Sequence, residues 1–126
     1  MSFNFNNSSG VLGAEGVQSS TAELTAEKLE WVKRAAGDRF AELELELAAY
    51  FTFVGDQGEA MAEGMGKAFG LTTEAMSQHP HGLFGPVDAI CEELVRRREL
   101  YGISYITIMD IAMGDFAPVV ARLAGC

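Results

Sequence analysis

The architecture is set by residues 82–109, which read GLFGPVDAICEELVRRRELYGISYITIM. A short apolar run ends at Gly85 and Pro86, and proline is favoured at the first turn of a helix. The following residues repeat apolar side chains at helical spacing on one face: Val87, Ile90, Leu94 and Tyr101. Gly102 stands where a left-handed C-cap is expected, and residues 103–109 are rich in β-branched side chains. The stretch predicts a strand, a helix and a second strand, which is typical of a parallel sheet.

The same alternation extends towards the N-terminus. Residues 43–53 have one polar face at first and become apolar on both faces, which predicts a strand that begins near solvent and enters a covered sheet. Residues 3–6 alternate as a first short strand that ends in a turn. Helices are predicted after the capping-box pattern at 20–23, over 61–69, from Thr72 and after Asp110. About four parallel strands alternating with helices predict a single α/β domain.

The composition of the chain excludes several classes of binding partner. Acidic residues number 18 against 9 basic ones, so the net charge is −9 and the chain repels nucleic-acid backbones and anionic membranes. The basic cluster Arg96, Arg97 and Arg98 spreads around a helix that also carries glutamates, so we expect a solvated helix face and no nucleic-acid partner. No apolar run approaches the roughly 20 residues that cross a bilayer, and the N-terminus lacks a signal-peptide pattern. Two cysteines without a CxxC motif indicate no metal site, and a cytoplasmic location is expected.

Four segments carry a family pattern: WVKRAAGDRF (31–40), LEL (43–45), RRELYGISYI (97–106) and FAPVVARLAG (116–125). They resemble the luciferase-like monooxygenase family, especially its actinobacterial, deazaflavin-dependent branch. The similarity covers nearly the whole chain but only the second half of that family's (β/α)8 barrel. The resemblance therefore implies that residues 1–126 form one half-barrel domain, half of a TIM barrel.

The resemblance also implies a cofactor. Members of the family use reduced flavin mononucleotide (FMN) or a reduced deazaflavin coenzyme for hydride transfer or oxygen insertion, at the C-terminal mouth of the barrel. By this resemblance the loop after the first strand contacts the phosphate-bearing tail of the cofactor, and its residues here are Asn6, Asn7, Ser8, Ser9 and Gly10. Glycine permits positive φ, and successive N–H groups with small hydroxyls can form an anion-binding nest, although such a sequence is also common in plain turns.

A second candidate phosphate contact is Gly85, where the family usually has Gly-Thr at the start of a helix. Pro86 replaces the threonine here, and Asp88 adds negative charge. A helix N-terminus still attracts anions through its free N–H groups, but proline removes one donor. A helix cap without ligand is the alternative interpretation.

Other polar residues receive a structural interpretation. His79 and His81 precede a strand, which in a barrel lies at the face opposite the chemistry, so we expect them to be structural or exposed. Asp56 and Asp110 follow strands and point towards the catalytic face, but no partner residue is evident. The sequence names no catalytic group.

Half a barrel leaves two strand edges and an apolar interior face open. We therefore expect a homodimer, or association with an N-terminal half, that completes the barrel and gives an active oxidoreductase. A non-catalytic cofactor-binding or assembly module is the alternative. A third possibility is that the chain is a piece of a longer enzyme.

Overall fold

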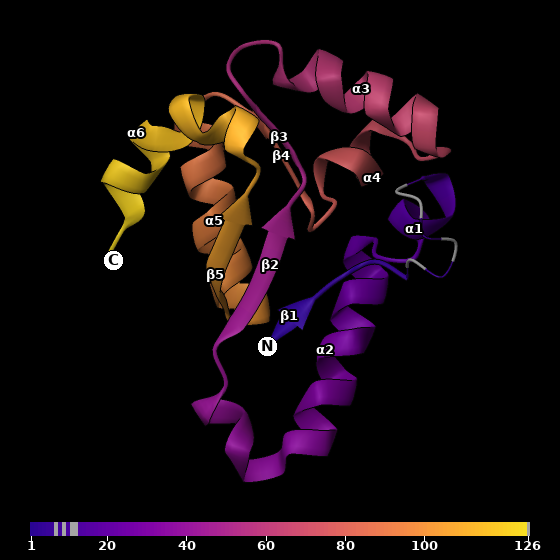
Figure 1. Cartoon of the computed structure of the whole chain (residues 1–126), viewed down its shortest axis with the longest axis vertical. Helices are drawn as coiled ribbons and strands as arrows, with labels where there is room; N and C mark the ends of the chain where they lie inside the picture. Colours follow the sequence, from indigo (N-terminus) through magenta and orange to yellow (C-terminus); the bar gives the residue numbers. More distant parts are fainter. Residues whose placement is uncertain (7, 9, 11–12, 126) are drawn as a thin grey trace.

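The computed structural model describes residues 1–6, 8, 10 and 13–125 (Figure 1). Strands and helices alternate along the chain in this order: β1 (Ser2–Phe3), α1 (Ala14–Gln18), α2 (Ala22–Ala36), the 3-10 helix η1 (Gly37–Glu42), β2 (Leu45–Ala49), β3 (Phe51–Val54), α3 (Gly58–Phe69), α4 (Thr73–Ser77), β4 (Gly82–Gly85), α5 (Val87–Tyr101), β5 (Ile103–Ile108), the 3-10 helix η2 (Asp110–Ala112) and α6 (Met113–Leu123). In this described part of the chain, no helix is both long and apolar enough to cross a bilayer.

One long extended segment, residues 45–54, belongs to both sheets. Its first half, β2, lies between β1 and β5 and pairs with both in parallel. Its second half, β3, pairs in parallel with β4. The parallel pairing and the alternating helices confirm the predicted α/β class.

The strand order differs from that of a simple half-barrel. In a half-barrel each strand bonds to the next one along the chain, so β4 would separate β5 from residues 45–54. Here Ile106 of β5 pairs directly with Leu47 of β2, while Phe84 of β4 pairs with Phe53 of β3. Both β5 and β4 thus pair with the segment at residues 45–54. β5 pairs with its first half and β4 with its second half.

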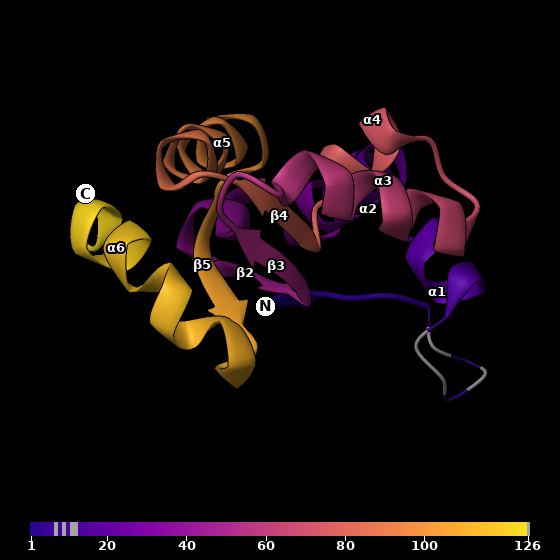
Figure 2. The same cartoon turned by 90° about the horizontal axis from the view of Figure 1, so that it is seen from above.

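Helices α2 and α5 cover one face of the three-stranded sheet (Figures 1 and 2). Leu45 and Leu47 point into this layer and pack with Leu29 of α2 and Tyr101 of α5. Farther along the strand, Ala49 belongs to a second buried cluster between β4, α5 and α6. Because buried and half-buried residues alternate along β2, the period of two matches a sheet with one well-covered face.

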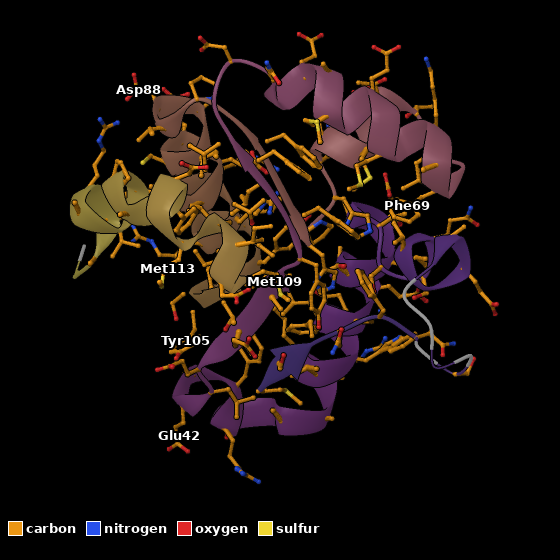
Figure 3. All side chains as sticks on the ribbon, turned by 45° about the horizontal axis from the view of Figure 1, so that its top comes forward. Glu42, Phe69, Asp88, Tyr105, Met109 and Met113 are labelled. Atoms are coloured by element: carbon orange, nitrogen blue, oxygen red, sulfur yellow. The ribbon has the colours of Figure 1, made fainter. Side chains whose placement is uncertain are left out.

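The other face of this sheet is open to solvent. Thr107 Oγ1 donates to Glu46 Oε1 across it at 2.9 Å. Large side chains at the same side of β5 and the start of α6 stay exposed, including Tyr105 (54%), Met109 (45%) and Met113 (67%) (Figure 3). Exposed apolar side chains that gather on one side of a protein commonly mark a surface for a partner.

Several predicted boundaries are confirmed and some details are wrong. Gly102 is the predicted left-handed C-cap of α5, with φ 73°. The cap of α2 is Thr21, whose side chain accepts from the Leu24 amide, whereas the capping-box prediction began at Ser20. Pro86 is the N-cap residue of α5 and so lies one position before its first turn.

Two further differences concern the ends of the chain. Helix α1 was not predicted, because its five residues are too few for a periodic pattern. The apolar spacing of residues 116–123 predicts an inward Val120, but this side chain is 51% exposed. Helix α6 packs at the margin of the sheet, and only a narrow stripe, Phe116 and Val119, is buried.

Gly58 lets α3 touch β4. A Cβ at this position would lie 2.1 Å from the Gly85 nitrogen and 2.9 Å from the Phe84 carbonyl carbon. These are backbone atoms of a hydrogen-bonded strand, so they cannot yield locally. The absence of a side chain at Gly58 therefore sets how closely α3 approaches β4.

We predict that Gly58→Ala lowers the free energy of unfolding by about 2 kcal/mol, because the added methyl group displaces α3 from β4. The control is Gly64→Ala in the same helix, where a Cβ meets nothing within 4 Å. That variant should gain about 0.5–1 kcal/mol, since alanine favours the helix more than glycine does. Urea unfolding followed by circular dichroism measures both. Equal stabilities would contradict the close approach.

Candidate functional site

A cavity of about 550 Å³ lies at the carboxyl end of β3. Its walls are residues 52–58, Met61 of α3, and Ile111, Ala112 and Asp115 from η2 and the start of α6. In open parallel sheets, ligands bind outside the carboxyl ends of the strands, and this volume is typical of small-molecule pockets. This cavity is therefore the candidate ligand site.

The charged residues of the cavity lining are both acidic, Asp56 and Asp115. Thr52 and Gln57 add neutral hydrogen-bonding groups, and the remaining lining residues are apolar or glycine. No lysine or arginine is among the lining residues, so a phosphate placed here would meet two carboxylates without a counter-charge. The cavity suits an uncharged ring, a hydroxyl-rich group or a cation.

Of the two aspartates that the sequence placed at this end, only Asp56 lines the cavity. Asp110 is the first residue of η2, and its Oδ1 accepts from the amide of the next residue, Ile111, at 2.9 Å. The sequence did not predict Asp115, because the prediction considered residues that directly follow strands, and Asp115 lies in the first turn of α6.

Gly85 closes β4 next to this cavity without lining it. Its φ is 122°, a conformation that favours glycine, and its carbonyl accepts from the Gly55 amide at 2.8 Å. Together with the approach of Gly58, these contacts make Gly85 the junction of β3, β4 and α3. Its role as a phosphate contact stays a prediction.

Of the predicted phosphate loop after β1, the structure describes Asn6, Ser8 and Gly10. The Asn6 amide donates to Ser19 Oγ at 2.8 Å, the Ser8 amide donates to Asn6 Oδ1 at 3.3 Å, and Gly10 has the expected positive φ of 74°. These contacts form an Asx turn anchored on α1. Asn7 and Ser9 lie outside the described residues. The contacts of Asn6 and Ser8 thus join them to Ser19 and to each other rather than to Gly85.

His79 and His81 are almost fully buried, at 0% and 1% exposure, at the amino end of β4. The His81 amide donates to His79 Nδ1 at 3.1 Å, so the proton of His79 lies on Nε2, which donates to the Val17 carbonyl at 2.8 Å. His81 Nδ1 donates to the Ala48 carbonyl at 2.7 Å. Both rings therefore act as neutral structural links from β4 to α1 and β2.

Burial keeps both imidazoles uncharged. It lowers the pKa of His81 to about 4 and also lowers the pKa of His79, and the nearby cations Arg97 and Lys28 act in the same direction. The backbone hydrogen bonds oppose this shift but are outweighed by the loss of solvation.

Arg97 was predicted on a solvated helix face, and that prediction is wrong: its side chain is 2% exposed. Its guanidinium donates to three backbone carbonyls before and within β4, those of His79 (3.2 Å), Pro80 (3.0 Å) and Gly82 (2.9 Å). Nε donates to Glu93 at 2.8 Å, one turn earlier in α5. Glu93 thus balances the charge of the guanidinium, and four of its five N–H donors are used.

A signal for this burial was present in the sequence. Ile90, Leu94, Arg97 and Tyr101 are spaced by four, three and four residues, so Arg97 belongs to the inward stripe of α5. Grouping it with its two neighbours hid that spacing.

The described chain offers few other centres for chemistry. Within residues 1–6, 8, 10 and 13–125, no three His, Cys, Asp or Glu side chains gather as a metal site. Further hollows of the described chain include one of about 270 Å³ between α5, α6 and β5, one of about 570 Å³ between β1 and α2, and one of about 490 Å³ on the outer side of α5 and α6.

We predict that Arg97→Met lowers the free energy of unfolding by about 3 kcal/mol or more, because three buried carbonyls lose their donor and Glu93 loses one of its two arginine partners. The matched control is Arg96→Met, which removes an exposed ion pair with Glu93 and should cost below about 1 kcal/mol. Urea unfolding measures both variants. A loss of similar size in the two would show that the buried bonds of Arg97 contribute little.

We predict that stability falls as the pH drops from about 6.5 towards 4. Below pH 6.5 the unfolded chain binds protons at His79 and His81 that the folded chain excludes, so His81 alone removes about 2 kcal/mol between pH 7.5 and 5. Urea unfolding at these two pH values tests this. The variant His81→Gln should be less stable at pH 7.5 but lose less on acidification. An unchanged pH dependence in the variant would refute the assignment.

Comparison of the chain with protein-family models, with curated proteins and with solved structures finds no match. The luciferase-like resemblance of the sequence segments accordingly stays a prediction.

Proposed function

We propose that the chain is a half-barrel module of a luciferase-like oxidoreductase that uses a flavin or deazaflavin, and that it acts after association with a second half-barrel. The observation that carries the proposal is a parallel sheet, covered on one face, with a ligand-sized cavity at the carboxyl end of β3, the strand that continues its central strand β2.

The cavity suits one part of such a cofactor. The ring of FMN or of a deazaflavin is flat and largely apolar with a few hydrogen-bonding atoms, which matches Phe53, Met61 and Ile111 together with Gln57 and Thr52. The phosphate does not fit, because Asp56 and Asp115 repel it. We therefore assign the phosphate to cations of a partner, with Gly85 as the contact from this chain. When bound, the cofactor would supply hydride transfer or oxygen activation.

The open side of the sheet supports the need for a partner. Tyr105 and Met109 lie on a face that helices do not cover in the described chain, and β1 and β5 are its edges. In a complete barrel the corresponding face is interior and both edges are paired. A second copy of the chain, or a separate N-terminal half, would supply the missing strands.

A non-catalytic cofactor-binding or assembly module is the second candidate. Two observations favour it: Pro86 occupies the start of α5, where the family has threonine, and the cavity is acidic. This module would keep the association surface of the sheet without supporting a reaction.

We predict that riboflavin, which lacks the phosphate, binds the chain about five-fold more tightly than FMN, because two carboxylates repel the phosphate. The double variant Asp56→Asn with Asp115→Asn should remove most of this difference. Asp38→Asn in η1, outside the cavity, is the control and should preserve it. Flavin fluorescence titration gives the affinities.

Equal binding of FMN and riboflavin to the original chain would contradict the assignment of the ring to this cavity. No fluorescence change with riboflavin, FMN or the deazaflavin coenzyme would exclude the oxidoreductase and leave the assembly module as the remaining candidate function. Light scattering in parallel reports the partner: a stable monomer at micromolar concentration would exclude the homodimer version.

A further inference from the structure

The groove between β1 and α2 has a volume of about 570 Å³ and differs in charge from the rest of this acidic chain. Its apolar wall includes Trp31, Val32 and Leu43. Trp31, the single tryptophan of the chain, is 54% exposed. A half-exposed indole beside other apolar side chains is a frequent anchor of protein interfaces.

Lys28 and Arg39 line this groove, and no carboxylate does. Lys28 Nζ donates to neutral oxygens, the Asn4 carbonyl at 3.2 Å and Ser20 Oγ at 2.8 Å, and burial lowers its pKa. Among the ion pairs of the described residues, none includes Lys28 or Arg39. Two cations without carboxylate partners thus lie along one apolar groove of a chain whose net charge is −9.

The groove also runs along a strand edge. β1 is the outer strand of its sheet, and its Met1 carbonyl accepts from the Glu46 amide of β2. Because backbone groups of successive residues point to opposite sides of a strand, the backbone of Ser2 faces away from β2. An extended segment can pair with this edge and place alternate side chains in the groove.

We propose that this groove binds an acidic, extended polypeptide segment of a partner protein, which adds to β1 as a strand. An apolar side chain of that segment packs on Trp31, and flanking carboxylates pair with Lys28 and Arg39. These cations are 11 positions apart in a largely helical segment, on the order of 15 Å, which corresponds to about four or five residues of a strand.

This inference rests on the proposed association of half-barrels and names its surface. A second copy is the poorer occupant, because its own free edge strand, β5, carries no acidic residue, and its acidic strand residue Glu46 already lies at the centre of a sheet. The charge of the groove therefore selects a different chain that offers an acidic strand.

The experiment uses the full chain and a blocked nine-residue peptide, acetyl-Thr-Val-Glu-Val-Phe-Val-Glu-Val-Thr-amide, with both glutamates and the phenylalanine on one strand face. Binding should shift the Trp31 emission to shorter wavelength in a saturable manner. The same peptide with lysines in place of the glutamates should bind about ten-fold more weakly, since two charge pairs become repulsive.

The variant Arg39→Glu should weaken the binding of the acidic peptide and strengthen the binding of the basic peptide. Arg34→Glu is the matched control, since it makes the same charge change on α2 outside the groove and should leave the peptide preference almost unchanged. No emission shift with the acidic peptide, or equal binding of both peptides, would overturn the proposal.

An emission shift that follows protein concentration alone, together with a dimer mass by light scattering, would overturn it in favour of a second copy. The peptide titration contains no flavin. A negative flavin titration with positive peptide binding would thus count against the cofactor only, and the opposite result would count against this groove only.

Discussion

The guanidinium of Arg97 brings a positive charge into the interior, and the segment before β4 is shaped around it. The carbonyls of His79, Pro80 and Gly82 all point to this one side chain, and Glu93 balances its charge. A buried charge without such partners is strongly unfavourable. Residues 79–82 therefore cannot slide along α5 without losing several bonds at once, and the start of β4 is fixed on that helix.

Because the start of β4 is fixed, the position of its carboxyl end is fixed as well. The His81 carbonyl accepts from the Phe51 amide, which sets the register of β4 on β3. In that register Gly85 reaches Gly55 and Gly58, so the loop at 52–58 and the start of α3 are held at the carboxyl end of the sheet. The candidate cavity is thus positioned by bonds at the opposite end of a four-residue strand.

The two histidines extend the same network sideways. Their rings bond to the carbonyls of Val17 and Ala48, so they connect β4 to α1 and to the central strand. Sequence reasoning placed them away from the chemistry, and the structure agrees on their position at the amino end of β4. Their burial was left open between structural and exposed, because a histidine in a loop gives no periodic signal.

Most elements could be predicted because their patterns are local. The stripe of α5, its Gly102 cap and the β-branched run of β5 each depend on neighbouring residues alone. Strand order does not depend on neighbouring residues. β5 lies about 60 residues from β2 and about 20 from β4 in the sequence, and the alternation of apolar residues is the same whichever of the two strands it bonds to. The acidic cavity was missed for the same reason, since Asp56 and Asp115 belong to different elements.

Two surfaces of opposite charge make the proposed cofactor binding depend on association. The cavity at the carboxyl end of β3 repels anions through Asp56 and Asp115, while the groove at β1 offers Lys28 and Arg39 to an acidic strand. A phosphate-bearing cofactor then needs cations from the partner, and the partner gains contacts when the cofactor is present. Each would raise the affinity of the other by the same factor, as linkage requires. Under this proposal, a chain of this charge distribution would therefore bind an anionic cofactor more tightly once the complementary half is in place.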